Sequence, residues 1–92
     1  MQSAPTDTMV SAIRTYVRET FLYARPDVAL ADEGSLLQQG VIDSMGVVEL
    51  VEFLQGTFGI HVEDDEITED NLGTIGAIAR YVSRKRNGGG RP

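Results

Sequence analysis

The chain of 92 residues contains no cysteine. This absence excludes a disulfide framework, a zinc site built on cysteines and a thiol nucleophile of the protein's own. No run of apolar residues approaches the length of a transmembrane helix, so we expect no membrane span. The first ten residues lack the basic start and apolar stretch of a secretory signal, and we therefore expect a cytoplasmic protein. The length predicts one small domain that buries a single core.

Positive charge is also scarce. The chain has 8 basic and 14 acidic side chains, a net charge of −6 that argues against nucleic-acid binding. All but two of the acidic residues lie between Pro26 and Ala79, a stretch that contains no Lys or Arg. A central region of one sign attracts basic partners, but it equally fits a solvated surface that keeps the protein soluble. Both interpretations remain open at this point.

Apolar residues at helical spacing predict three longer helices. The first begins near Thr6 or Asp7 and ends before Pro26, the second begins at Asp43–Ser44, and the third begins after Thr74 as N-cap. The predicted buried stripes are Val10, Ile13, Val17 and Phe21; Val47, Leu50, Val51, Leu54 and Phe58; and Ile75, Ile78, Ala79 and Val82.

The segments between these helices predict one short helix and one long loop. Residues 64–71 fit at most one acidic helical turn, whereas residues 26–43 show no period and form a long loop. The loop residues expected to reach the core are Val28, Leu30, Leu36, Leu37, Val41 and Ile42. The fold class is therefore all-α, a small four-helix bundle with three longer helices and one short one. We expect a flexible N-terminus over residues 1–6, a folded domain over 7–85 and a flexible basic, glycine-rich tail over 86–92.

Ser44 lies at the predicted start of the second helix. A serine in this position is most often an N-cap, but Asp43 could equally cap the helix and leave the hydroxyl free. A phosphodiester on Ser44 would then face the unpaired amides and the positive end of the helix dipole. The residues alone allow either role.

The run Gly40-Val41-Ile42-Asp43-Ser44-Met45, followed by Gly46-Val47-Val48-Glu49-Leu50-Val51, resembles the phosphopantetheine attachment site of acyl carrier proteins. The flanks resemble the family too, in Leu36-Leu37 upstream and in Phe58-Gly59-Ile60-His61-Val62 and Asn71-Leu72-Gly73-Thr74-Ile75 downstream. The resemblance covers about residues 9–83.

The resemblance implies a carrier and not an enzyme. It implies that a phosphopantetheinyl transferase, with magnesium, attaches a 4'-phosphopantetheine arm to Ser44, with Asp43 helping to position the site. Acyl or aminoacyl cargo would then be held on the arm as a thioester and passed between adenylating ligases, synthases or transferases. Met45, Val48, Glu49 and Glu52 would form the adjoining partner surface, and we expect a monomer.

The departures from the family pattern bear on the pathway. Gly46 follows Met45 where carriers of bulk fatty-acid synthesis usually have an acidic residue, and Gln38-Gln39 replaces more acidic residues. The sequence is closer in appearance to stand-alone carriers that serve dedicated adenylating enzymes, including aminoacyl and specialised acyl carriers. The pathway, whether fatty acid, polyketide or nonribosomal peptide biosynthesis, stays open. The alternative from another class is an unmodified acidic helical domain that docks a basic partner.

Other candidate sites are weaker. His61 is the only histidine, and no serine–acid arrangement accompanies it. Residues 63–66 are acidic, but they lack the alternating ligands and the turn glycine of an EF-hand loop, so we expect no metal site. Arg84, Lys85 and Arg86 fit a basic chain end.

Overall fold

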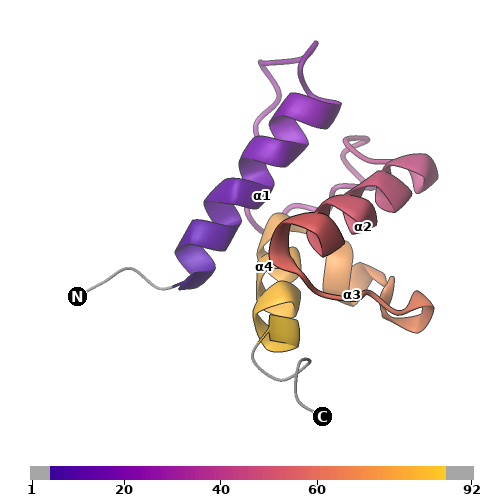
Figure 1. Ribbon diagram of the computed structural model, residues 1–92. Coiled ribbons are helices and arrows are strands. Elements are labelled where there is room, and N and C mark those ends of the chain that lie inside the picture. Colours follow the sequence, from indigo (N-terminus) through magenta and orange to yellow (C-terminus); the bar gives the residue numbers. More distant parts are fainter. Residues whose placement is uncertain (1–4, 87–92) are drawn as a thin grey trace.

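The computed structural model describes residues 5–86, and these form helices joined by loops, without a strand. The three longer helices are α1 (Pro5–Phe21), α2 (Ser44–Phe58) and α4 (Ile75–Arg84). The short elements are a 3-10 turn, η1 (Asp64–Glu66), and α3 (Glu69–Leu72). Figure 1 shows α4 between α1 and α3, and α4 packs mainly against these two helices. The predicted all-helical bundle of three longer helices and a short one is confirmed.

Helix α1 begins at Pro5, slightly ahead of the expected cap at Thr6 or Asp7. Proline suits the first turn of a helix because its missing amide would have no partner there. The helix ends at Phe21, before Pro26 as predicted. Residues 1–4 and 87–92, on which most of the expected flexible N-terminus and tail fall, lie outside the described residues.

Helix α2 has a defined cap at each end. The extended backbone of Asp43 (φ −113°, ψ −171°) allows its carboxylate to accept a hydrogen bond from the amide of Gly46. At the other end Gly59 adopts φ 69° and donates its amide to the carbonyl of Gln55 at 3.0 Å. This left-handed conformation favours glycine and stops the helix.

The buried core draws on every helix of the bundle. Its apolar members are Met9, Ile13, Val17, Leu22, Leu30, Leu36, Val41, Ile42, Leu50, Leu54, Val62, Leu72, Ile75, Ala77, Ile78, Ala79, Tyr81 and Val82. Val10, Phe21, Val47, Val51 and Phe58, which were predicted to be core, are partly buried against it. The prediction that Leu37 reaches the core is wrong, because its side chain is 49% exposed. The amide of Leu36 donates to the carbonyl of Gly73, and the Leu36 side chain is buried. Leu37, the next residue of the turn, therefore faces outward.

The connection between α1 and α2 (residues 22–43) is held against the bundle by polar contacts as well as by its apolar residues. The guanidinium of Arg14 donates to the carbonyl of Leu30 and to the carboxylate of Asp32, and that of Arg18 donates to the carbonyl of Val28. Two arginines of α1 thus hold the middle of the connection against the bundle.

Within the described residues, no helix has both the length and the apolar character needed to cross a membrane.

Candidate functional site

Ser44 is the first residue of α2 and its side chain is exposed. It lies where the long connection meets α2. The free amides of a first helical turn, together with the helix dipole, favour a negatively charged group at this position.

The capping role that the sequence left open belongs to Asp43. Its Oδ1 accepts from the amide of Gly46 at 2.9 Å, and its carbonyl accepts from the amide of Val47 at 3.0 Å. Among the side-chain hydrogen bonds that the structure describes for residues 8–86, none involves the hydroxyl of Ser44. The hydroxyl is therefore both accessible and unnecessary for the integrity of the helix.

Gly46 fixes the first turn of α2 against the rest of the protein. It is buried, and a Cβ added there would lie 2.9 Å from Cε1 of Phe21 and 3.1 Å from Cγ2 of Ile42. Glycine thus permits the end of α1 and the end of the connection to pack directly on the turn that carries Ser44. Sequence reasoning noted Gly46 only as a departure and missed this contact, because Phe21 is far from it along the chain.

One side of the site is an exposed face of α2. Met45 is 73% exposed and Val48 is 54% exposed, which is unusual for large apolar side chains. Glu49 and Glu52 are exposed on the same helix. The four residues of the predicted partner surface therefore lie on exposed parts of α2 that begin next to Ser44, as two apolar side chains accompanied by two carboxylates.

The other side of the site is a small cavity of about 100 Å³ between α2 and α3. Its lining includes Leu36, Ile42, Val47, Ile67 and Leu72, with Leu37 at its exposed margin. Ile67 is itself 39% exposed, so this cavity opens toward solvent and not only into the core.

His61 and the acidic turn at residues 63–66 form neither a catalytic nor a metal-binding arrangement. His61 lies 3.4 Å from a carboxylate oxygen of Glu63, and both side chains are well exposed. Across residues 8–86, no group of three or more His, Cys, Asp or Glu side chains is arranged to hold a metal ion. The acidic turn instead has a structural role, because Glu63 and Glu66 form a reciprocal capping box around η1.

Comparison with known proteins decides between the two functions that the sequence left open. Residues 11–82 match the family described as "Phosphopantetheine attachment site". The chain belongs to the phosphopantetheine-binding carrier family. Carriers of this family bear a covalently attached 4'-phosphopantetheine and are not catalysts, so this protein is a carrier with that cofactor and not an enzyme.

Curated relatives within this family are named D-alanyl carrier proteins. The chain is 38% identical over 61 residues to those of Streptococcus sanguinis (strain SK36) and Streptococcus thermophilus (strain LMD-9), which covers 66% of this chain and 77% of each relative. It is 38% identical over 56 residues to that of Streptococcus pyogenes serotype M1, covering 61% of this chain and 71% of the relative. Carriers of this family work in general with a phosphopantetheinyl transferase and with ligases or synthases.

Proposed function

We propose that the 4'-phosphopantetheine of this carrier is attached to Ser44, and that the protein passes thioester-bound cargo between biosynthetic enzymes. The observation that carries the proposal is that Asp43, and not Ser44, caps α2. The carboxylate of Asp43 accepts from the amide of Gly46 at 2.9 Å, and the hydroxyl of the exposed Ser44 has no capping role.

The residues around Ser44 fit a phosphodiester. In the transfer, the Ser44 oxygen forms a bond to the phosphorus of coenzyme A that bears the pantetheine, the pyrophosphate bond breaks, and adenosine 3',5'-bisphosphate leaves. The transferase would take up the hydroxyl proton, and its magnesium would stabilise the charge of the leaving group. The N-terminal turn of α2 then stabilises the remaining negative charge on the product. When bound, the arm supplies the terminal thiol that this cysteine-free chain lacks.

Asp43 has two parts in this scheme. Its carboxylate holds the first turn of α2, and its charge lies next to the hydroxyl that must enter the transferase. Met45, Val48, Glu49 and Glu52 form the surface on which visiting enzymes dock, since exposed apolar side chains give contact area and carboxylates attract basic patches. Weak and salt-sensitive association suits a carrier that must leave each enzyme.

A small acyl or aminoacyl group is the cargo that we propose, with D-alanine as the first candidate. Two observations support this choice. The relatives of this chain are named D-alanyl carrier proteins. In addition, the cavity lined by Ile42 and Val47 measures about 100 Å³, which is smaller than an apolar cavity of about 150 Å³ that holds one benzene molecule. A specialised pathway served by an adenylating ligase fits such a cargo better than the synthesis of long acyl chains.

The monomeric state remains a prediction. The cytoplasmic location is also a prediction, and it fits the proposal because the transferase uses coenzyme A and the adenylating ligase uses ATP.

The test is the intact mass of the protein after incubation with coenzyme A, magnesium and a broad-specificity phosphopantetheinyl transferase. The wild-type chain gains the mass of one phosphopantetheine, and Ser44→Ala gains none. Ser11→Ala is the matched control, because Ser11 is also an exposed helical serine, and it is modified like the wild type. Modification of Ser44→Ala, or none on the folded wild-type chain with several transferases, would contradict attachment at Ser44. The loaded protein is then offered to D-alanine:carrier ligases and to fatty-acyl ligases, and a preference for long acyl chains would contradict the small cargo.

A further inference from the structure

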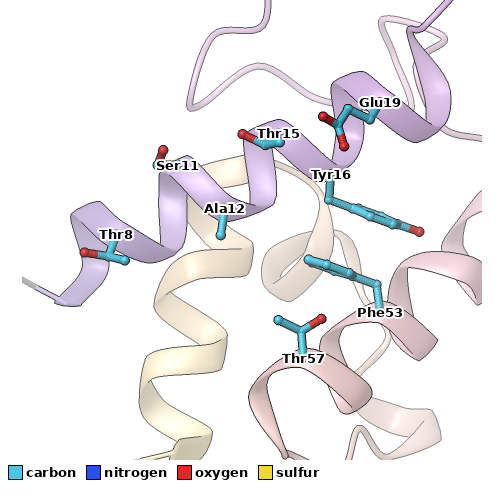
Figure 2. A pocket seen from close by; sticks show the side chains of 8 residues that line it. All are labelled: Thr8, Ser11, Ala12, Thr15, Tyr16, Glu19, Phe53 and Thr57. Carbon is cyan, nitrogen blue, oxygen red and sulfur yellow. The ribbon is translucent and has the colours of Figure 1, made fainter.

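A second surface of the protein is unexplained by the carrier chemistry. It is an open groove of about 750 Å³ between α1 and the C-terminal half of α2. Figure 2 shows its lining, which is Thr8, Ser11, Ala12, Thr15, Tyr16 and Glu19 from α1 and Phe53 and Thr57 from α2. Phe53 is nine residues beyond Ser44, which corresponds to about 13 Å along the helix axis. The groove is therefore separate from the attachment site.

An aromatic pair forms the centre of the groove. The rings of Tyr16 and Phe53 stack with their centroids 3.9 Å apart and their planes at 8°. Both side chains are only partly buried, so the pair joins the two helices and is still accessible from the groove. An accessible aromatic face binds apolar side chains and also the cationic groups of Arg or Lys.

The charges around this pair are of one sign. Glu19 lines the groove, and Glu49 and Glu52 are close enough to act on the phenol of Tyr16. Burial raises the pKa of Tyr16, and these two carboxylates raise it further, against the hydrogen bond with Thr20. Among the side chains of residues 8–86, none forms an ion pair with any of the three carboxylates.

The arginines of α1 do not neutralise the groove. Arg14 is directed to Leu30 and Asp32, and Arg18 is directed to Val28, all in the connection on another side of α1. The groove thus presents apolar aromatic surface together with unpaired negative charge. A basic and partly apolar occupant matches both features.

The shape of the groove indicates the form of that occupant. Along α1 the lining is made of the small side chains of Thr8, Ser11, Ala12 and Thr15, and it extends to Glu19. This is about three helical turns, a length of about 16 Å. Small side chains allow the axis of another helix to approach closely. An α-helix of about twelve residues would fill the groove from end to end.

We infer that this groove is a second docking surface, which takes a basic amphipathic helix of a partner protein. The apolar side chains of that helix cover Ala12 and Phe53, and an arginine lies against Tyr16 beside Glu19. A partner held there leaves Ser44 and the surface of Met45, Val48, Glu49 and Glu52 free for another enzyme. This inference does not depend on the arm, because none of its contacts includes Ser44.

The probe is a stapled helical peptide of about twelve residues with leucines on one face and two arginines beside them. Its control peptide has glutamates in place of the arginines. We titrate each peptide into the ¹⁵N-labelled chain of 92 residues and follow the amide shifts. The arginine peptide is expected to shift saturably the amides of residues 8–19 and 53–57, and the glutamate peptide is not. Raising the salt concentration weakens the binding.

Two pairs of matched variants locate the contact. Glu19→Gln weakens binding about threefold, whereas Asp65→Asn, which removes an exposed charge elsewhere, leaves it unchanged. Ala12→Gln places a longer side chain in the groove and weakens binding about tenfold, whereas Ala24→Gln, at an exposed position after α1, does not. Thermal unfolding of all four variants checks that they are folded.

Several results would overturn the inference. They are the absence of saturable binding, shifts centred on Met45 and Val48, and equal weakening by Glu19→Gln and Asp65→Asn. Shifts of the groove amides with protein concentration alone would mean that a second copy of the chain occupies it instead. Ser44→Ala, which cannot carry an arm if the proposed attachment is correct, binds the peptide like the wild type. The inference of a docking surface and the proposal of attachment at Ser44 can therefore be disproved independently of each other.

Discussion

The phenol of Tyr81 donates a hydrogen bond of 2.8 Å to Oε1 of Glu66. The same carboxylate accepts from Nζ of Lys85 at 3.0 Å and from the amide of Glu63 at 3.0 Å. These bonds tie η1 to α4. The pKa of Glu66 is lowered to about 2 by the amide of Glu63, then by Lys85 and Tyr81. Burial raises the pKa of Tyr81, and its bond to Glu66 raises it further.

Glu66→Gln is expected to reduce the free energy of unfolding at pH 7 by about 2 kcal/mol, because it replaces charge-assisted hydrogen bonds by neutral ones. The lowered pKa adds a pH dependence. A carboxylate whose pKa falls from 4.5 to about 2 on folding stabilises the protein above pH 4.5. That contribution is lost as the pH falls from 4.5 toward 2.

Urea unfolding between pH 7 and pH 2 measures this effect. The wild-type chain loses more stability across the acid range than Glu66→Gln does. Asp65→Asn serves as the control, because Asp65 belongs to the same turn and is exposed. If the two variants have the same pH profile, Glu66 is not the group responsible.

A second prediction separates the two parts proposed for Asp43. Asp43→Ala loses the bond to the amide of Gly46 and destabilises the protein by about 1 kcal/mol. Asp43→Asn keeps a capping oxygen and retains most of that stability. If the transferase uses the charge of Asp43, both variants are loaded more slowly than the wild type. Equal loading rates of Asp43→Asn and wild type, measured by intact mass, would mean that only the cap matters.

Local chemistry explains which features could be predicted from the sequence. The cap at Thr74 was predictable, since a short acceptor side chain before an apolar period is a local signal. At α2 the same signal allowed either Asp43 or Ser44, and only the structure assigns the cap to Asp43. The wrong assignment of Leu37 to the core arose in a loop, where no period indicates which side chain faces inward. The burial of Met9 and Leu22 was not predicted, because both lie just outside the predicted apolar stripe that runs from Val10 to Phe21.

The site was predictable only in part for the same reason. The run around Ser44 indicates an attachment site through neighbouring residues. The contacts that hold it, such as Phe21 on Gly46, join distant segments and follow from the packing of the whole chain. The groove at Tyr16 and Phe53 likewise requires two helices to be placed side by side.

Gly46→Ala tests the first of these contacts. Alanine has the higher helix propensity, but its Cβ would lie 2.9 Å from the ring of Phe21 and 3.1 Å from Ile42. Because Ile42 is buried and cannot move away freely, we expect a net loss of about 1 kcal/mol in the free energy of unfolding. Gly56→Ala is the control, since a Cβ at Gly56 meets no atom within 4 Å and alanine there stabilises the helix. Equal gains in stability from both substitutions would contradict the close packing at Gly46.

The connection that leads to Ser44 provides the last prediction. Arg14 donates to the carbonyl of Leu30 and to Asp32, so Arg14→Met keeps the apolar stem but leaves the half-buried carbonyl without this donor. We expect a loss of about 1 to 2 kcal/mol. The opening should be local, because the amide of Leu36 is held separately by the carbonyl of Gly73 at 2.9 Å.

Hydrogen exchange distinguishes local from global opening in this variant. The amide of Val28 is bonded to the carbonyl of Arg25, and that of Gly34 to the carbonyl of Ala31. Both amides exchange faster in Arg14→Met. The amide of Leu36 has the same protection as in the wild type once the change in global stability is subtracted. Arg25→Met is the control, because Arg25 is exposed. The loading rate of Arg14→Met stays at the wild-type value, since Asp43 caps α2 and the segment from Leu36 to Ile42 keeps its own anchors in the core. A fall in loading that accompanies faster exchange only at Val28 and Gly34 would instead mean that the two arginine-held turns help to position Ser44.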